Sequence, residues 1–524
     1  MRRITIFDTT LRDGDQAFNF GGKEKLALAL ALAEAGVDVI ETGFPLSGRI
    51  DFEICRTAAR ELQDLTAPGD PCCRPLTAVM CRGLPRDIAE TAKVFSGGIS
   101  GILHISLPVS RIHIGAKLGK TEGELIALAR EAVFFAAGLV SEVELGAEDA
   151  FRADRDFLLE YCRAAVDSGA RRINIADTLG VSSPGGAGEL TGFLCSRVPA
   201  FASGRALLSI HCHNDLGLAC ANTLAALEAG CGQAEVSVSG MGERAGNAAL
   251  EEVAANIDLR SRETGLYTGL MPEQFPKIIR LAAEMAGSAL SLMKPLSGWN
   301  TRSHSSGIHQ QGLSKNTETY SLPGLEQWMT APERIVLSRH SGRVGTALFA
   351  ERYCGLALDG ETAALVTEKI KNNETLTGIT EFLCILSDLG RLPAAFPGPL
   401  VRLSFSGSFT GTGSGIESGA AWQVGAVLGV YGAAQRTWEI SGAGTSEAAA
   451  VSQALRNLCD RAPEFSRIAL NGCGGRTRLY TEMVLPSGNC YALERIGPSA
   501  AEILLLCGLD ALNAEAVRRQ GRRM

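Results

Sequence analysis

The sequence predicts an α/β fold in which eight strand–helix units close into a (β/α)8 TIM barrel over residues 1–262. Short apolar, β-branched runs alternate along this region with amphipathic segments rich in alanine, leucine and glutamate. The number of runs, eight, is the number that closes a barrel of this kind. A doubly wound open sheet is the alternative. It usually has a Gly-x-Gly-x-x-Gly turn after its first strand, and Thr9–Gly14 lacks that pattern.

The predicted barrel strands are, in chain order, Ile4–Thr10, Val37–Phe44, Leu76–Met80, Gly101–Pro108, Glu142–Gly146, Arg172–Asp177, Leu207–Asn214 and Ala234–Ser239. The helices predicted between them include Lys23–Ala35, Glu122–Ala137, Asp154–Ser168 and Leu216–Ala229. Another helix is predicted to begin at Ser183-Pro184, because serine caps a helix and proline suits its first turn. The chemistry of such a barrel gathers at the carboxyl ends of its strands, and polar residues follow the predicted strands there.

The rest of the chain is predicted to form two further domains. Residues 263–391 are helical linker subdomains, with apolar helical patterns at Glu361–Lys371 and Thr380–Leu389. Leu392–Pro399 holds three prolines and a glycine, which indicates a linker at the start of a C-terminal α+β domain, residues 392–524. Its predicted strands are Val401–Phe409, Ala426–Val430, Arg436–Ile440, Ile468–Leu470 and Leu479–Leu485, and its predicted helices are Ser446–Leu458 and Ser499–Leu512.

Composition excludes several kinds of partner. Hydrophobic residues make up 46% of the chain and charged residues 20%, as in soluble globular proteins. The formal net charge of −7, without a basic block, argues against nucleic acid binding. No apolar stretch approaches the length of a membrane-spanning helix, and the amino terminus is unlike a signal peptide. The 15 cysteines form no Cys-x-x-Cys pair, so we expect reduced thiols and a cytoplasmic location.

Two histidines one residue apart close the seventh predicted strand. Alternate side chains of a strand share a face, so His211 and His213 are expected to point the same way. Together with the carboxylate of Asp13, they suit a divalent cation such as Zn²⁺, Mn²⁺ or Co²⁺. Water and substrate oxygens would also admit Mg²⁺. A pair of hydrogen-bonded core histidines is the alternative interpretation.

Such a site suits the chemistry of 2-oxo acids. A cation with open coordination positions can bind the carboxylate and keto oxygens of a 2-oxo acid and polarise its carbonyl. Arg12, next to Asp13, can neutralise the charge of an enolate or alkoxide. A histidine or a carboxylate can take the proton from a carbon acid. Each polar residue taken alone is also consistent with a helix cap or a structural ion pair, but their convergence on one face favours an active site.

Three segments together resemble the acyl-CoA-dependent Claisen-condensing synthases, the family of 2-isopropylmalate, homocitrate and citramalate synthases. The segments are Asp8–Gln16, His211–Ala219 and Gly242–Glu252. The resemblance implies acetyl-CoA as cosubstrate of a 2-oxo acid and a divalent Mg, Mn or Zn cation. It also implies a homodimer in which the linker segment contributes to the partner's site. The C-terminal domain looks like a diverged regulatory domain of 2-isopropylmalate synthase, with Gly442–Gly444 as one similarity.

The resemblance also implies a role for each site residue. The implied metal ligands are Asp13, His211 and His213, with Asn247 at or near the ion. The implied catalytic residues are Arg12, Glu148, His309 and Tyr320, and the implied substrate-binding residues are Gln16, His104 and Thr178. Ser306–Gln310, which contains His309, resembles the linker segment that supplies the family's catalytic histidine.

These motifs limit the candidate 2-oxo acids to a few without deciding between them. The run Gly307–Gln310 favours 2-isopropylmalate synthase, which condenses acetyl-CoA with 2-oxoisovalerate in leucine biosynthesis. Homocitrate synthase with 2-oxoglutarate and citramalate synthase with pyruvate are alternatives, because Gly146 and Ala176 replace a serine and a proline usual near the oxo-acid pocket. Glu144 disfavours 2-oxoglutarate if it faces the site, because two carboxylates repel each other, whereas Arg82 would favour it if it reaches the pocket.

Two other classes of function compete with a synthase. A lyase on the same barrel would cleave a hydroxy-oxo acid by retro-aldol chemistry, but the Gly307–His309 segment argues against it. A non-catalytic amino-acid sensor built on the C-terminal domain is the other class. The intact set of Arg12, Asp13, His211 and His213 weighs against that interpretation.

Overall fold

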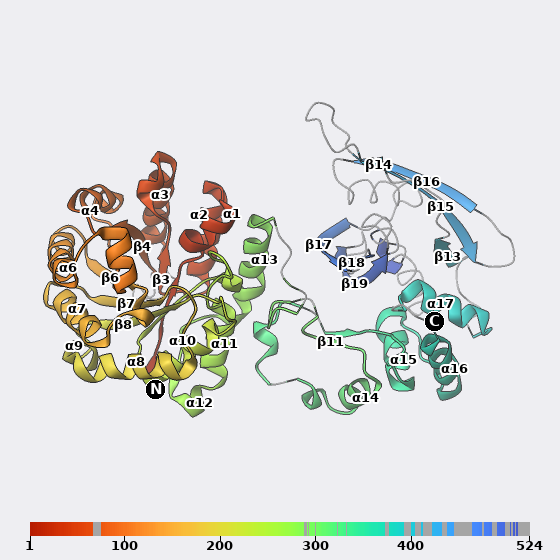
Figure 1. The fold of residues 1–524 in the computed structure, drawn as a ribbon. Coiled ribbons are helices and arrows are strands. Elements are labelled where there is room, and N and C mark those ends of the chain that lie inside the picture. Colours follow the sequence, from red (N-terminus) through yellow and green to blue (C-terminus); the bar gives the residue numbers. More distant parts are fainter. Residues whose placement is uncertain are drawn as a thin grey trace. The chain divides into compact units, whose positions relative to one another are not determined.

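The computed structural model describes residues 1–65 and 75–287, together with 291–391 apart from 292, 299, 322, 332 and 373–376. Beyond 399 it describes the strands between 400 and 497 and five helical residues after 503. The chain divides into two compact units (Figure 1). The first unit holds residues 1–290, 295–297 and 324–330, and the second holds the remainder. The predicted domain boundaries at 262 and 391 stay predictions.

The first unit is a closed barrel of eight parallel strands, which confirms the predicted fold class. The strands are β2 (Thr5–Asp8), β3 (Val39–Glu41), β4 (Leu76–Arg82), β5 (Gly101–Pro108), β6 (Glu142–Glu148), β7 (Arg172–Asp177), β8 (Leu207–Cys212) and β9 (Gln233–Val236). Strand β9 pairs with β2 and completes the ring. The carboxyl ends of all eight strands therefore meet at one mouth.

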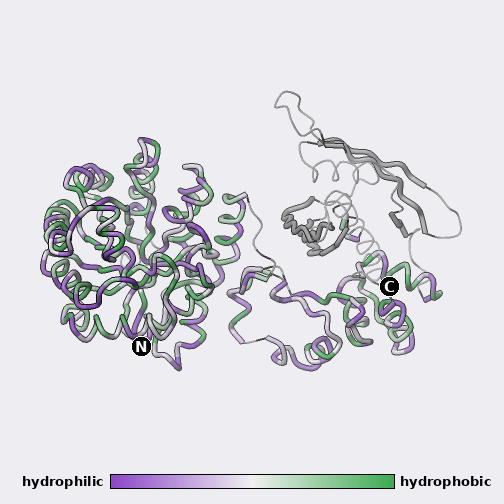
Figure 2. The backbone as a smooth tube through the Cα atoms, viewed as in Figure 1, coloured by the Kyte–Doolittle hydropathy of each residue, from purple (hydrophilic) through white to green (hydrophobic). Residues whose placement is uncertain are grey.

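Helices surround the barrel (Figure 1). They include α2 (Gly22–Glu34), α3 (Arg49–Asp64), α4 (Pro85–Ala92), α6 (Glu122–Ala137), α7 (Arg155–Asp167), α8 (Pro184–Arg197), α10 (Ala219–Ala229), α11 (Leu250–Leu259) and α13 (Phe275–Met285). Helix α8 begins as predicted: the Ser183 side chain accepts a hydrogen bond from the Gly186 amide, and Pro184 is the first helical residue. Hydrophilic and hydrophobic residues alternate along these helices, as expected when one face is buried (Figure 2).

The chain leaves the first barrel strand earlier than predicted. Strand β2 ends at Asp8, whereas the sequence predicted a strand as far as Thr10. The Asp8 carboxylate accepts hydrogen bonds from the amide and hydroxyl groups of Thr10, at 3.0 and 2.9 Å. Such local bonds compete with strand pairing and turn the chain. The turn is the π-helix η1 (Thr10–Gly14), which leads into the short helix α1 (Asp15–Phe18).

The second unit begins with a short parallel pair, β11 (Ser303–His304) and β12 (Arg334–Ile335). Its helices include α14 (Gly307–Lys315), α15 (Arg343–Phe349), α16 (Gly360–Lys371) and α17 (Ile379–Asp388). Helices α16 and α17 match the predicted apolar patterns to within one residue at each end.

The C-terminal region contains two antiparallel sheets. Their strands are β13 (Leu400–Leu403), β14 (Thr410–Gly411), β15 (Trp422–Tyr431), β16 (Thr437–Gly444), β17 (Glu464–Cys473), β18 (Arg476–Val484) and β19 (Cys490–Gly497). Strand β19 was not predicted, because charged residues interrupt its apolar run. The predicted helix Ser446–Leu458 and the predicted linker lie outside the described residues. Of the predicted helix Ser499–Leu512, the five described residues are helical. Nowhere in the described parts of the chain does a helix combine the length and apolarity needed to cross a membrane.

Candidate active site

Three potential metal ligands come together at the mouth of the barrel. Asp13 lies on η1 after β2, while His211 and His213 lie at the end of β8. One ligand atom from each side chain lies within 4.8 Å of the others, and all three residues are buried. The Nε2 atoms of the two histidines are 3.2 Å apart, so both rings point at the same place. We call these residues the Asp–His–His cluster.

The groups around this cluster fit a divalent cation. Nδ1 of His211 lies 3.2 Å from the Glu235 carboxylate, which leaves Nε2 turned towards the other ligands. A carboxylate behind a histidine in this way is the usual support of a metal-binding imidazole. Asn247 donates a hydrogen bond of 2.6 Å to Asp13, and its buried side-chain oxygen has no hydrogen-bond partner. An unpaired buried amide oxygen beside these donors is a further candidate ligand.

Arg12 lies at the centre of a buried set of carboxylates. Its guanidinium contacts Asp13 at 2.9 Å, Glu41 at 2.7 Å and Glu235 at 3.0 Å. Burial opposes ionisation of Glu41, but the charges of Arg12 and His104 outweigh it and hold the pKa of Glu41 below its usual range. The mouth of the barrel therefore contains a fixed guanidinium charge next to the Asp–His–His cluster.

His104 on β5 carries a second positive charge. Its Nδ1 lies 2.8 Å from the Glu41 carboxylate, and the ring is almost fully buried. Burial favours the neutral ring, but the charge of Glu41 prevails and raises the pKa of His104 to about 9. The charged form of His104 is therefore favoured at neutral pH, and its predicted contact with the substrate stays a prediction. Sequence reasoning noted Glu41 among the polar residues at the strand ends but gave it no role, and it missed Glu235. The available signal was a charged residue within an otherwise apolar barrel strand.

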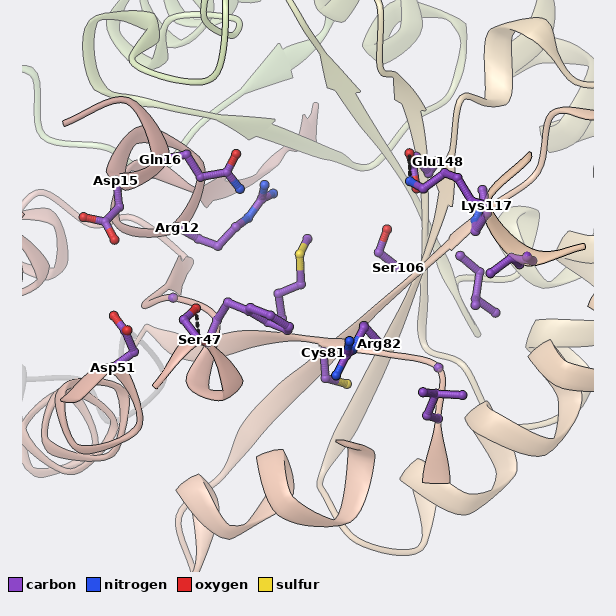
Figure 3. A pocket seen from close by; sticks show the side chains of 18 of the residues that line it. Arg12, Asp15, Gln16, Ser47, Asp51, Cys81, Arg82, Ser106, Lys117 and Glu148 are labelled. Atoms are coloured by element: carbon purple, nitrogen blue, oxygen red, sulfur yellow. Dashed lines mark hydrogen bonds and ion pairs between the residues drawn. The ribbon is translucent and has the colours of Figure 1, made fainter. Parts of the chain in front are cut away.

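A cavity of about 670 Å³ opens beside Arg12 (Figure 3). Arg12 and Gln16 lie on one side of it, and Glu148 and Lys117 lie on the other. Its apolar wall includes Phe44, Met80, Leu84, Leu107, Leu118 and Leu128. Arg82 also lines the cavity, but its Nε is bound to Asp87 at 2.6 Å. The structure thus brings two predicted site residues, Gln16 and Glu148, to one cavity with Arg12.

Two further residues weighed in the sequence lie elsewhere on the barrel. The Thr178 hydroxyl, at the end of β7, accepts a hydrogen bond of 2.9 Å from the Asp149 amide. Glu144 on β6 is fully buried and accepts a hydrogen bond of 2.8 Å from Gln233. Burial raises the pKa of Glu144 to about 7. Glu144 is not among the residues that line the cavity.

His309 and Tyr320 belong to the second unit. His309 lies on α14, and its ring stacks on Tyr320 with ring centroids 4.1 Å apart. His304 is next to this pair, with its ring centroid 6.3 Å from that of Tyr320. The two predicted catalytic residues of the linker are therefore together, and their action on a barrel site stays a prediction.

The barrel and its Asp–His–His cluster define a class, the barrel enzymes that carry a potential metal site at the carboxyl ends of their strands. Residues 3–275 match the HMGL-like family, and residues 296–376 match the homocitrate synthase post-HMGL domain-like family. The chain belongs to the HMGL-like family, within its acyl-CoA-dependent Claisen-condensing synthases, and it is an acyltransferase of the 2-isopropylmalate synthase type. The recognition made from the motifs is confirmed.

Three relatives with similar sequences are all named 2-isopropylmalate synthases. The 2-isopropylmalate synthase of Nitratidesulfovibrio vulgaris is 35% identical over 490 residues, covering 92% of this chain and 90% of the relative. The 2-isopropylmalate synthase 1 of Caldanaerobacter subterraneus subsp. tengcongensis is 39% identical, covering 66% of this chain and 84% of the relative. The 2-isopropylmalate synthase of Acetivibrio thermocellus is 40% identical, covering 69% and 68% respectively.

Proposed function

We propose that this enzyme condenses acetyl-CoA with 2-oxoisovalerate to give 2-isopropylmalate, a step of leucine biosynthesis, and that it requires a divalent cation. The observation that carries the proposal is the adjacency of Arg12 and Asp13, which puts a buried guanidinium beside the Asp–His–His cluster. We further propose that it acts as a cytoplasmic homodimer whose linker segments contribute to the partner's site.

Asp13, His211 and His213 would hold the cation, with Asn247 as an additional ligand. The cation, of which Mg²⁺, Mn²⁺ and Zn²⁺ are the candidates, would supply Lewis-acid polarisation of the keto group. Glu235 would keep the His211 ring oriented through its Nδ1.

The charged residues around the cluster supply the remaining electrostatics. Condensation removes a proton from the acetyl methyl group, forms a carbon–carbon bond to the keto carbon and leaves negative charge on the keto oxygen. Arg12 and the imidazolium of His104 are fixed, buried cations that would stabilise such charge. Glu148 at the cavity and His309 of the linker are the two candidates for the base.

The cavity favours a branched apolar oxo acid. Its wall includes Phe44, Met80 and Leu107. A second carboxylate, as in 2-oxoglutarate, would need a cation of its own, because an unpaired buried charge is costly. The two other cations that line the cavity are engaged, Arg82 with Asp87 and Lys117 with Glu148. Because Arg82 is already paired with Asp87, it does not supply the free cation that a second carboxylate would need.

The test is a substrate panel. Purified full-length protein is incubated with acetyl-CoA and with 2-oxoisovalerate, 2-oxoglutarate or pyruvate, and free thiol is followed as CoA is released. We expect the highest kcat/KM with 2-oxoisovalerate. A higher value with 2-oxoglutarate or pyruvate would move the assignment to homocitrate or citramalate synthase. Absence of thiol release with every 2-oxo acid would overturn the condensation itself.

A further inference from the structure

A lysine that the reaction described above does not use lies against Glu148. Lys117 belongs to a π-helical turn, η5 (Ile114–Leu118), in the connection between β5 and α6. Its Nζ lies 2.6 Å from one carboxylate oxygen of Glu148 and 2.9 Å from the other. Both side chains line the cavity, and Figure 3 shows the pair on the wall that faces Arg12. A contact to both oxygens restricts rotation of the carboxylate as well as its position.

The other charged groups near Glu148 do not hold its carboxylate by both oxygens. His113, from the short helix α5 (Arg111–His113), has its Nδ1 3.1 Å from a Glu148 oxygen, but this nitrogen makes no hydrogen bond. The neighbouring acid, Asp149, is bound by the Arg152 guanidinium through both of its own oxygens. Among the described residues around Glu148, Lys117 is therefore the side chain that contacts both of its oxygens.

The pair has little value for folding. The Lys117 side chain is 51% exposed, and ion pairs between exposed side chains contribute little to stability because water screens them. The turn that presents Lys117 is nevertheless an unusual one, because π-helical turns are rare and occur frequently at functional sites. A residue that is dispensable for stability but fixes a cavity carboxylate is best explained by its effect on that carboxylate.

We propose that Lys117 is a positioning residue, which holds the Glu148 carboxylate against the cavity wall in the orientation that the condensation needs. The inference rests on the proposed function, because it takes Glu148 as a residue that acts on the substrates. Lys117 itself does not touch the reacting atoms. Without it, Glu148 keeps its place on β6, but its carboxylate is free to rotate.

Three variants of the full-length protein separate this role from a general loss of charge. Lys117→Gln removes the ion pair. Lys117→Arg restores a cation that can bind both oxygens of a carboxylate. Lys120→Gln is the matched control, since Lys120 is exposed in the same connection and its loss changes the net charge by the same amount. All three should melt at the temperature of the unchanged protein.

Kinetics provide the first readout. We expect Lys117→Gln to lower kcat by about 10- to 100-fold, the effect of misplacing a catalytic group by about 1 Å, with little change in KM for the 2-oxo acid. Lys117→Arg should recover most of kcat, and Lys120→Gln should keep it. An unchanged kcat in Lys117→Gln would overturn the inference. A loss shared equally by Lys120→Gln would also overturn it, because the effect would then be one of net charge.

A chemical readout is independent of activity. A carbodiimide without added amine joins a paired lysine and carboxylate by an amide bond, with loss of water. Peptide mass spectrometry of the treated protein should find Lys117 joined to Glu148. Lys93 and Glu90, 2.6 Å apart on the surface, serve as the positive control. If that control pair is joined and Lys117–Glu148 is not, the inference fails even when condensation is active. If no 2-oxo acid supports condensation, the proposed function fails while the cross-link still reports on the pair.

Discussion

The carboxylate of Glu41 lies 2.8 Å from Nδ1 of His104, and the pair connects β3 to β5 inside the barrel mouth. The same carboxylate also binds Arg12, so one buried anion holds two cations. Without Glu41, Arg12 would keep Asp13 and Glu235 as partners, whereas the His104 ring would lose the carboxylate that contacts its Nδ1. Substitution of Glu41 should therefore disturb both cations, although no sequence motif assigned this residue a role.

Glu41→Gln should therefore reduce both stability and activity. We expect the free energy of unfolding to fall by about 1 to 3 kcal/mol, because the buried His104 would lose its charged partner while Arg12 keeps Asp13 and Glu235. Scanning calorimetry of barrel unfolding measures this decrease in stability. Glu53→Gln, exposed on α3, is the matched control and should change neither property. A Glu41→Gln protein as stable as the control would show that the pair has no net stabilising effect.

Removal of the cation should abolish activity. We expect an exhaustively chelated sample to be inactive and to recover when Mg²⁺, Mn²⁺ or Zn²⁺ is added, because Asp13, His211 and His213 offer their ligand atoms to one point. His211→Ala should lose most of its bound metal by elemental analysis. His340→Ala removes an exposed histidine of the second unit and should keep it. Full activity after chelation would contradict the metal requirement.

The linker histidine should act on turnover rather than on binding. We expect His309→Ala to lower kcat by about 100- to 10,000-fold, the usual contribution of general acid–base catalysis, while 2-oxo acid binding changes much less. Steady-state kinetics and direct titration of the 2-oxo acid separate the two effects. A loss of less than about tenfold would exclude His309 as the base and favour Glu148 instead.

The raised pKa of Glu144 predicts that the stability of the protein depends on pH. Burial raises its pKa from 4.5 to about 7, so the folded protein prefers the protonated acid. The unfolded chain releases this proton at a lower pH, and stability is therefore lost as the pH rises from about 4.5 to 7. Glu144→Gln removes this cost, and its amide oxygen can still accept the hydrogen bond from Gln233.

Melting temperatures between pH 5 and pH 8 test this expectation, a range set roughly by the two pKa values. Glu144→Gln should melt above the unchanged protein at the alkaline end, and the difference should shrink towards the acid end. Glu131→Gln, exposed on α6, should follow the unchanged protein throughout. An equal shift at both ends would mean that packing, rather than ionisation of Glu144, is responsible.

The fold could be predicted because its signals are local. The strands Gly101–Pro108 and Arg172–Asp177 and the helix Glu122–Ala137 have the predicted bounds, since periodicity along a short stretch determines which face is buried. The end of the first barrel strand was misplaced because a side chain bonds a neighbouring residue of the chain. The residue is Asp8, and its bonds to Thr10 exist only once the turn has formed.

The residues around the Asp–His–His cluster were predictable only in part. His211 and His213 share a face because a strand has a period of two, which needs no knowledge of neighbouring strands. Glu235 supports His211 because the two residues are register partners on adjacent strands, β8 and β9. Register between strands is a property of the assembled barrel, and a single strand does not contain it. The unassigned residues are those whose partners lie on another strand.

The π-helical turn η1 carries Arg12 and Asp13 at consecutive positions. A protein engineer cannot adjust one without moving the other, because both depend on the same few backbone torsions. Changing the preferred metal through Asp13 would therefore disturb the charge stabilisation supplied by Arg12. The cavity wall is built differently, since Phe44, Met80 and Leu107 come from separate connections and strands. Laboratory evolution of substrate range should accordingly diversify this wall and leave the first turn of the barrel mouth intact.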